Sequence, residues 1–133
     1  MKLVYDNSQW GGARLLVVGD LMLDTCVSGP VERLSPEAGV PVVRVDSERS
    51  APGGAANVAM NLSSLGASVA LCGVAGQDRT WDDLATILTR EGVDIASVTS
   101  CSQRQTTHKM RLSSRGLPMA RLDFEASETI GPD

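Results

Sequence analysis

The sequence predicts an α/β fold with a mainly parallel sheet and a small excursion of β-strands, and three observations carry this prediction. Two short apolar runs, residues 15–19 and 69–74, are typical of strands buried on both faces of a parallel sheet. A glycine-rich turn and a helical pattern lie between them, which is the order of a β-α-β unit. From residue 103 onward the sequence alternates as an antiparallel hairpin does.

The first strand ends at Gly19, and Asp20 and Asp24 are expected at or just beyond its carboxyl end. Open α/β sheets bind their ligands at that edge, so both carboxylates are candidates for ligand contacts. Residues 27–30 and 40–45 predict two further short strands, with prolines at turns or sheet edges. Because they precede the glycine-rich turn, we expect them to form an excursion from the main sheet.

The glycine-rich turn runs from Ala51 through Gly53 and Gly54 into a helix that carries Asn57 one turn in. Glycines let the backbone approach a ligand closely, and a helix N-terminus presents free N–H groups. Asn57 has both a donor and an acceptor, as the recognition of a sugar hydroxyl requires. The same residues also suit a plain turn between a loop and a helix, so the turn alone does not decide for a ligand site.

Two helices are predicted on either side of the second buried strand. The first follows the glycine-rich turn and ends at Gly66. The second spans residues 80–91, with Thr80 as its cap, Asp83 in its first turn and Gly92 as its stop. The apolar faces expected to pack in the core consist of Val58, Leu62 and Leu65 in the first helix and of Trp81, Leu84 and Leu88 in the second.

The predicted hairpin joins residues 107–112 to residues 119–124 through a turn at 113–116. Alternation places Thr107, Lys109 and Arg111 on one face, and His108, Met110 and Leu112 on the other. Five basic residues and no acidic one lie from Arg104 to Arg121, in a chain that is acidic elsewhere. This local excess suggests an anionic group nearby, and a solvated hairpin face is the alternative.

Composition excludes several classes of protein. The 133 residues suit one domain, and 42% hydrophobic and 21% charged residues are ordinary for a folded protein. The net charge of −4 argues against a nucleic-acid partner. No apolar run is long enough to span a membrane, and the N-terminus lacks the apolar segment of a signal peptide, so we expect a cytoplasmic protein.

The residues that most often carry nucleophilic or metal chemistry give no signal here. Cys26, Cys72 and Cys101 fit no metal-binding spacing, so we expect three buried free thiols and no metal site. The single histidine, His108, has no obvious Ser or Cys partner. We expect it to be a strand residue that faces solvent or a partner side chain, and we assign no catalytic residue to this chain.

Several segments occur together: GDLMLD at 19–24, RLSPEA at 33–38, VPVV at 40–43, the glycine pair with Asn57, KMR at 109–111 and RLDFE at 121–125. Over about residues 15–125 they resemble the ribokinase-like (PfkB) carbohydrate kinases, and within that family the kinases of heptose 7-phosphate. The resemblance implies the N-terminal portion of a three-layer kinase domain, with lid strands at about 25–50 and 105–124. It also implies ATP-dependent phosphate transfer to a phosphorylated sugar, heptose 7-phosphate giving heptose 1,7-bisphosphate.

The same resemblance assigns substrate-binding roles to Asp24, Gly53, Gly54, Asn57, Lys109, Arg111 and Arg121. Asp24 and Asn57 contact sugar hydroxyls in this interpretation, and the glycine pair lies where the lid meets the core. The three cations face the phosphate that the substrate already carries. Relatives commonly have an aromatic residue in the segment at 25–29, which this chain lacks, so the identity of the sugar stays open. The lid strands further imply a homodimer contact.

One expected motif is missing. The resemblance places catalysis in a Gly-Ala-Gly-Asp segment near the C-terminus of such kinases, and this sequence does not contain it. We therefore expect that the nucleotide-binding part is absent, that this chain binds neither ATP nor Mg²⁺, and that it is inactive in isolation. The alternative function is a non-catalytic sugar-binding or dimerisation module.

Overall fold

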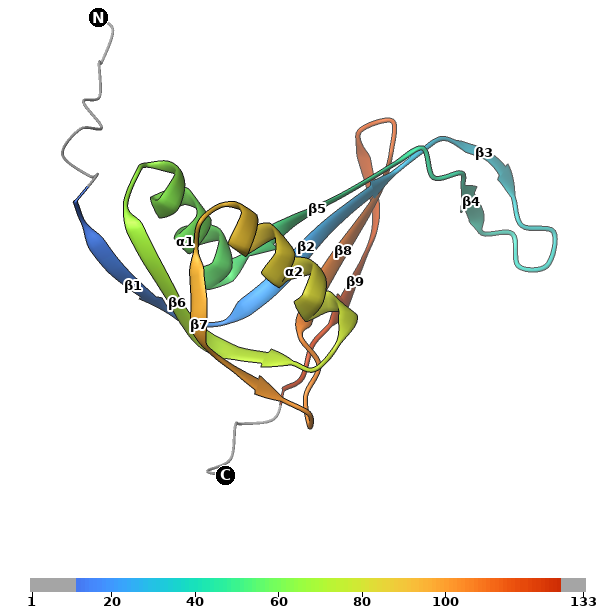
Figure 1. The fold of residues 1–133 in the computed structure, drawn as a ribbon. Helices are drawn as coiled ribbons and strands as arrows, with labels where there is room; N and C mark the ends of the chain where they lie inside the picture. The colour runs from blue at the N-terminus through green and yellow to red at the C-terminus, as the bar shows by residue number, and fades with distance from the viewer. Residues whose placement is uncertain (1–11, 128–133) are drawn as a thin grey trace, which may run out of the picture.

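The computed structural model describes residues 12–127, which form nine strands and two helices (Figure 1). In chain order these are β1 (Arg14–Val18), β2 (Leu21–Ser28), β3 (Val31–Leu34), β4 (Pro41–Val43), β5 (Ser47–Gly53), α1 (Gly54–Ser64), β6 (Ser68–Gly76), α2 (Arg79–Arg90), β7 (Asp94–Cys101), β8 (Thr107–Ser114) and β9 (Leu117–Phe124). The α/β class expected from the sequence is confirmed.

The first sheet contains three strands in the order β1-β6-β7, and both of its pairings are parallel. Figure 1 shows α1 and α2 on the same side of this sheet. The core lies beneath them and is built from small and aliphatic side chains, of which Leu71, Leu84 and Leu88 are fully buried. The β-α-β interpretation of residues 15–74 is therefore confirmed.

The prediction that the first strand is buried on both faces is wrong. Leu15 and Val17 pack against the core, but Leu16 is 63% exposed and Val18 is 68% exposed. Alternate side chains of a strand point to opposite faces, and among the described residues the helices cover only one face of this sheet. The continuous apolar run of β1 therefore leaves an apolar stripe on the uncovered face.

The second sheet contains four strands in the order β5-β2-β8-β9, and it extends from the core as an arm that ends in the β3–β4 hairpin (Figure 1). Its β2–β8 pairing is parallel, whereas the β2–β5 and β8–β9 pairings are antiparallel. The two ends of segment 25–50 thus lie in one sheet with strands of segment 105–124, while β3 and β4 between those ends form a separate two-stranded sheet. The buried hydroxyl of Thr25 joins three of these strands through hydrogen bonds of 2.8 Å each with Ser50 Oγ and His108 Nε2.

Asp24 does not lie at the carboxyl end of the first strand, as the sequence suggested. Only two residues separate β1 from β2, so the chain leaves one sheet and enters the other at once. Asp20 occupies the crossing point, and Asp24 lies within β2. The apolar alternation of β2, with Leu21, Leu23 and Val27 buried, is obscured because the polar Thr25 occupies a buried position and the apolar Met22 lies on the other face.

Of the face expected for helix α1, only Leu62 packs against the core. Ala56 and Ala59 are fully buried, whereas Val58 is 49% exposed and Leu65 is 42% exposed. The two alanines leave room for the helix axis to approach the sheet closely, so larger side chains are displaced to the flanks. Gly66 ends the helix as predicted, with a positive φ of 94°.

Helix α2 agrees with the prediction in its core face but not in its cap. The side chain of Asp78, not Thr80, accepts a hydrogen bond from the backbone N–H of Trp81 over 2.9 Å. Asp82 is the acidic residue of the first turn, while Asp83 forms a partly exposed ion pair with Arg79 at 3.8 Å.

Only residues 27–28 of the strand predicted at 27–30 belong to a strand, the end of β2, and the strand predicted at 40–45 is the shorter β4. Strands β3, β5 and β7 are not predicted from the sequence. Most of their side chains are exposed, so they lack the apolar alternation that identifies a strand. The hairpin is confirmed, and its turn is made by Arg115 and Gly116, both with positive φ.

The cysteine and histidine expectations had mixed outcomes. All three cysteines are free, but Cys26 is exposed and the other two are only half-buried, because each lies on the less covered face of its sheet. His108 faces a partner side chain, Thr25, and its ring stacks on Phe124 with centroids 5.8 Å apart.

Candidate ligand-binding face

Strand register gathers the predicted site residues on the face of the arm that points away from the helices. Asp24 pairs with Lys109 across β2 and β8, and Lys109 pairs with Asp123 across β8 and β9. Since side chains alternate along each strand, Asp24, Gly53, Lys109, Arg111 and Arg121 share this face. We call it the polar face.

Asp24 and Arg111 form the central contact of the polar face. Arg111 Nη1 donates to Asp24 Oδ1 over 3.1 Å. The second carboxylate oxygen lies against Gly53, where a Cβ atom would come within 2.6 Å of Oδ2. Residue 53 must therefore be glycine because the Asp24 side chain occupies the space that a Cβ would need. This packing requirement is separate from the conformational freedom that a turn requires.

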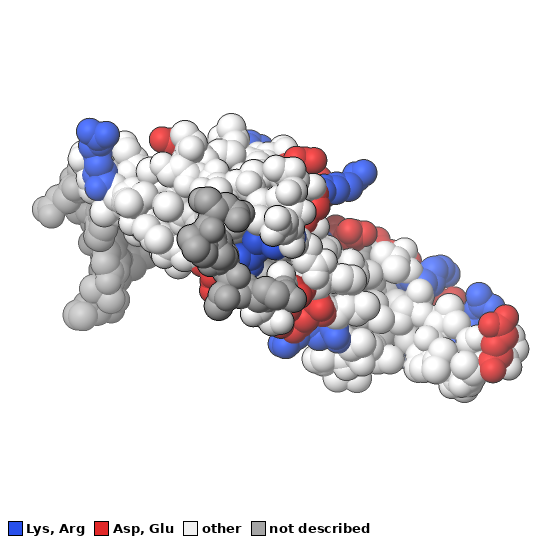
Figure 2. All heavy atoms as spheres, turned by 90° about the horizontal axis from the view of Figure 1, so that it is seen from below, with Lys and Arg blue, Asp and Glu red and all other residues white. Residues whose placement is uncertain are grey.

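The other predicted cations of the polar face also have acidic neighbours. Lys109 Nζ lies 3.8 Å from Glu125 Oε2, and Arg121 Nη2 donates to Asp123 Oδ2 over 2.8 Å. Three of the five basic residues from Arg104 to Arg121 therefore have carboxylate neighbours, Asp24 in β2, Asp123 in β9 and Glu125 just after β9. Figure 2 shows basic and acidic side chains interspersed on the face in view, with no large patch of one sign.

The glycine-rich turn is built into the junction between the arm and α1. Gly54 has a φ of 56°, and a Cβ atom there would lie 2.5 Å from the carbonyl oxygen of Asp20. The next residue, Ala55, donates its N–H to that same carbonyl over 2.9 Å. Asn57 is exposed in the first turn of α1, and its Oδ1 accepts from Asn61 Nδ2 over 3.2 Å.

A cavity of about 250 Å³ lies next to the polar face, at the edge where the parallel strands end. The polar side chains that line it are those of Asp20, Arg104, Thr107, Lys109 and Glu125. Arg104 belongs to the basic segment, but the sequence does not assign it to the site, because it precedes the regular alternation of the hairpin. Its position just before β8 is the one sequence feature that could have indicated its role.

Asp78 fastens the start of β8 to the α/β core. One of its oxygens caps α2, and the other accepts from the backbone N–H of Thr106 over 2.7 Å. The hydroxyl of Thr106 in turn accepts from the buried N–H of Gly76 over 2.8 Å. Burial alone would raise the pKa of the Asp78 carboxyl, but hydrogen bonds from Thr106, Trp81 and Thr80 outweigh it, so this pKa lies below its ordinary value of 3.8.

Metal and membrane signals are absent from the described part of the chain. Residues 12–127 contain no group of three or more His, Cys, Asp or Glu side chains arranged to hold a metal ion. None of their helices combines the length and the apolar character that crossing a bilayer demands.

Comparison with known proteins decides the family. The model of the pfkB family carbohydrate kinases matches residues 13–119, which include both helices and every strand from β1 to β8 and end within β9. This chain is a pfkB family member. The resemblance drawn from the GDLMLD, glycine-pair and KMR segments is thereby confirmed. The matched region includes Asp24, Gly53, Lys109 and Arg111 of the polar face and ends before Arg121.

Two relatives of high identity share the name Bifunctional protein HldE. The Bifunctional protein HldE of Pseudomonas aeruginosa strain LESB58 is 49% identical over 113 residues, and that of Chromohalobacter salexigens is 50% identical over 116 residues. These alignments cover 85% and 86% of this chain, respectively. This pfkB chain spans only about a quarter of each relative, 24% in both cases.

Solved structures agree on the fold. A carbohydrate kinase from Agrobacterium tumefaciens matches with a TM-score of 0.69 and 26% identity, over 84% of this chain and 35% of the kinase. The Arabidopsis thaliana ribokinase complexed with ribose and ATP matches with a TM-score of 0.64 and 19% identity, over 86% of this chain and 35% of the ribokinase. The latter likeness concerns the fold alone.

Proposed function

We propose that this chain is the sugar-binding portion of an ATP-dependent kinase that acts on a phosphorylated sugar. The proposed substrate is heptose 7-phosphate, and the proposed product is heptose 1,7-bisphosphate. Membership of the pfkB family and the HldE relatives support the reaction class. We also propose the cytoplasm as its location.

The observation that carries this proposal is the fixed carboxylate of Asp24 on the face that also carries Lys109, Arg111 and Arg121. Arg111 and Gly53 hold Asp24 in place, so its orientation is set before a ligand arrives. An ionised carboxylate accepts hydrogen bonds from two sugar hydroxyls, and the exposed amide of Asn57 serves a third. Gly54 is assigned to the sugar site through the sharp turn with positive φ by which it starts α1 beside Asp20.

The phosphate of the substrate is assigned to Lys109, Arg111 and Arg121. Each already has a carboxylate neighbour, but a guanidinium has five N–H donors, and the Arg111 contact with Asp24 uses one of them. The Lys109–Glu125 separation of 3.8 Å is longer than a charge-assisted hydrogen bond, so Lys109 exchanges Glu125 for phosphate oxygens at low cost.

ATP and Mg²⁺ are assigned to segments outside the residues described here. The sequence has no Gly-Ala-Gly-Asp segment, and the described residues hold no metal-ligating cluster. The proposed role of this chain is therefore to bind the sugar, and not to transfer the phosphate by itself. The arm formed by residues 25–50 and 105–124 acts in this proposal as a lid over the sugar.

The second candidate is a dimerisation module, and the edge of the arm favours it. Strand β9 pairs on one side only, and Leu117, Met119, Leu122 and Phe124 on it are each 42% exposed or more. Exposed strand edges with apolar side chains pair readily with other chains. We propose that a homodimer forms through these lid strands, which is compatible with the sugar-binding role.

A thermal unfolding experiment tests the sugar-binding role. The protein is melted with heptose 7-phosphate, with free heptose and with neither, at several protein concentrations. A ligand that binds only the folded state raises the unfolding free energy by RT ln(1 + [L]/Kd), so the phosphosugar is expected to raise Tm more than free heptose does. An increase of Tm with protein concentration alone supports the dimer instead.

The matched variants are Lys109→Ala and Lys2→Ala, which remove a lysine from the polar face and one from outside the described residues. Lys109→Ala is expected to reduce the shift caused by heptose 7-phosphate while leaving the shift caused by free heptose unchanged. Equal reduction of both shifts removes Lys109 from the phosphate role. Absence of any shift with either sugar contradicts the proposed function.

A further inference from the structure

The cavity at the carboxyl edge of the parallel sheet contains an unexplained buried donor. Arg104 Nε is buried and has no hydrogen-bond partner among the described residues. A buried donor without a partner is unfavourable, and more so when it belongs to a charged group, so such a group requires an explanation. The Arg104 side chain lines the same cavity of about 250 Å³ as Lys109.

We propose that Arg104 is a further substrate-binding residue, which donates from Nε to an oxygen of the phosphate group of a sugar phosphate. The choice of a sugar phosphate rests on the proposed function. The presence of an anion subsite in this cavity rests on Arg104 itself and on the groups around it.

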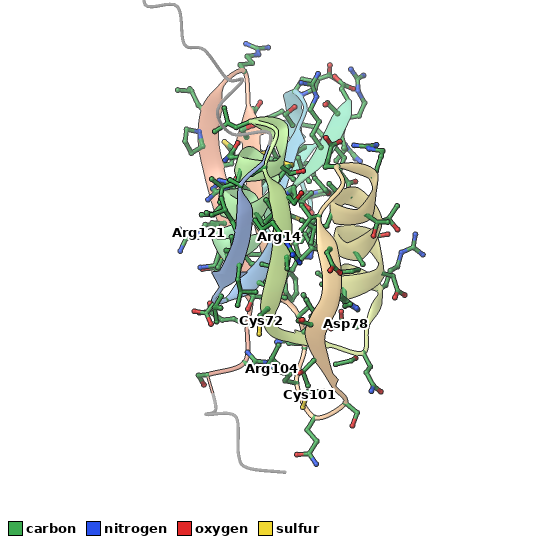
Figure 3. The ribbon with its side chains drawn as sticks, turned by 60° about the vertical axis from the view of Figure 1, so that its left-hand side comes forward. Arg14, Cys72, Asp78, Cys101, Arg104 and Arg121 are labelled. Atoms are coloured by element: carbon green, nitrogen blue, oxygen red, sulfur yellow. The ribbon has the colours of Figure 1, made fainter. Side chains whose placement is uncertain are left out.

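The backbone of Arg104 is held in place from the core side. Its carbonyl oxygen packs over Gly76, where a Cβ atom would come within 2.7 Å of it. The neighbouring Thr106 is bonded to both Asp78 and Gly76. Figure 3 shows Arg104 at the same end of the sheet as Asp78 and Cys101. The guanidinium is therefore presented by an anchored segment, which reduces the entropy lost when a ligand binds.

The size of the cavity limits the ligand. A volume of about 250 Å³ exceeds several-fold the roughly 30 Å³ that one water occupies in the liquid. It lies below the range of about 300–1,000 Å³ typical of pockets for drug-sized ligands. A phosphate group with the adjoining carbon of a sugar fits this limit, whereas a whole nucleotide does not.

The charges around the cavity favour a sugar phosphate over a bare anion. Arg104 and Lys109 supply cations, and Asp20 and Glu125 supply carboxylates. Phosphate oxygens accept from the cations, while neighbouring sugar hydroxyls donate to the carboxylates. Inorganic phosphate engages only the first pair and meets repulsion from the second, so we expect it to bind more weakly than the sugar phosphate.

The cavity is also at the right distance from the sugar contacts. Met22 lines it, and Asp24 lies two residues further along the same face of β2, about 7 Å at the usual rise of a strand. Lys109 belongs to both the polar face and the cavity lining. One extended sugar phosphate can therefore contact Asp24 with its hydroxyls and both Arg104 and Lys109 with its phosphate. In this orientation Arg111 and Arg121, which lie beyond Asp24 along the strands, contact the sugar rather than the phosphate.

The test compares Arg104→Lys with Arg90→Lys by calorimetric titration of heptose 7-phosphate and free heptose. Arg104→Lys keeps the positive charge but removes the Nε donor, and Arg90 is an exposed residue at the end of α2, outside the arm and the cavity. We expect Arg104→Lys to weaken binding of heptose 7-phosphate at least tenfold and binding of free heptose less than twofold. Arg90→Lys should change neither. Unchanged binding, or equal losses for both sugars, overturns the proposal.

A second measurement, on the unaltered protein, tests the subsite even if the Arg104→Lys variant does not fold or the proposed substrate is wrong. The ¹⁵N resonance of Arg104 Nε is followed during titration with inorganic phosphate. A saturable shift supports the anion subsite even if heptose 7-phosphate does not bind. If neither inorganic phosphate nor heptose 7-phosphate moves this resonance, the subsite does not exist.

Discussion

Arg111 and Asp24 are 87 residues apart in the sequence, yet they meet across the parallel strands β8 and β2 at 3.1 Å. This contact connects the hairpin to the first strand of the arm on the polar face. Asp24 is also the residue against which Gly53 packs, so three segments converge on one carboxylate. The site thus depends on the pairing of the arm strands rather than on any one local motif.

Replacing Asp24 is expected to weaken sugar-phosphate binding strongly while changing the unfolding free energy little. In Asp24→Asn the side chain keeps its shape but loses the charge and one acceptor, so affinity for heptose 7-phosphate should fall at least tenfold. The ion pair with Arg111 is partly exposed, so its loss should cost no more than about 1 kcal/mol of unfolding free energy. Calorimetric titration and urea unfolding measure the two quantities.

Asp46→Asn is the control for this change, because Asp46 forms an exposed ion pair with Arg44 outside the polar face. It should leave affinity unchanged. If Asp24→Asn binds heptose 7-phosphate as well as the unaltered protein does, Asp24 has no part in sugar recognition.

Gly54→Ala is expected to destabilise the fold more than Gly39→Ala. Both glycines have a positive φ, 56° and 64°, so alanine is strained at either position by about 1–2 kcal/mol. At Gly54 the new Cβ would also lie 2.5 Å from the carbonyl oxygen of Asp20, whereas at Gly39 it meets nothing within 4 Å. Urea unfolding should therefore show a larger loss of unfolding free energy for Gly54→Ala than for Gly39→Ala. Equal losses would mean that the backbone at Asp20 shifts at no cost to make room for the new Cβ.

The sequence was most informative where chemistry is local. Gly66 and Gly92 end their helices because a left-handed residue is required there, and Arg115-Gly116 closes the hairpin for the same reason. The alternation of β8 also indicated correctly that Lys109 and Arg111 share a face. These features depend on neighbours within a few residues.

What could not be predicted depends on contacts between distant segments. The polar sequence of β5 forms a strand only because β2 pairs with it, and Asp24 entered a second sheet because the chain crosses over within two residues. Likewise, Arg104 follows no periodic pattern, and only the folded chain places it beside Lys109 in a cavity. The acidic partners of the basic segment became visible only through strand register.

Asp78→Ala is expected to lower the unfolding free energy at neutral pH by about 2–4 kcal/mol. The change removes the cap of α2, about 0.5–2 kcal/mol, and leaves the N–H of Thr106 without its acceptor, about 1–3 kcal/mol. Asp82→Ala, in the same helix turn but without a hydrogen bond of its side chain in the described structure, should cost much less. Urea unfolding at pH 7 measures the difference.

This effect should depend on pH in a defined direction. The pKa of Asp78 is lower in the folded protein than its ordinary value of 3.8, so the unfolded chain binds the proton more readily. The stabilisation is fully present well above pH 3.8 and is lost as the pH falls through 3.8 toward the folded pKa. The gap between the unaltered protein and Asp78→Ala should therefore narrow below about pH 4, and a constant gap would show that ionisation is irrelevant.

The uncovered face of the three-stranded sheet gives the last prediction. Leu16→Ser changes a side chain that is 63% exposed, so at low protein concentration it should alter the unfolding free energy by less than about 0.5 kcal/mol. Leu71→Ala, in the neighbouring strand but fully buried, should cost about 2–5 kcal/mol. Urea unfolding at two protein concentrations checks both. A large loss for Leu16→Ser that appears only at high concentration would mean that a second copy covers this face, whereas a large loss at every concentration would mean that β1 is buried on both faces, as its apolar run had first indicated.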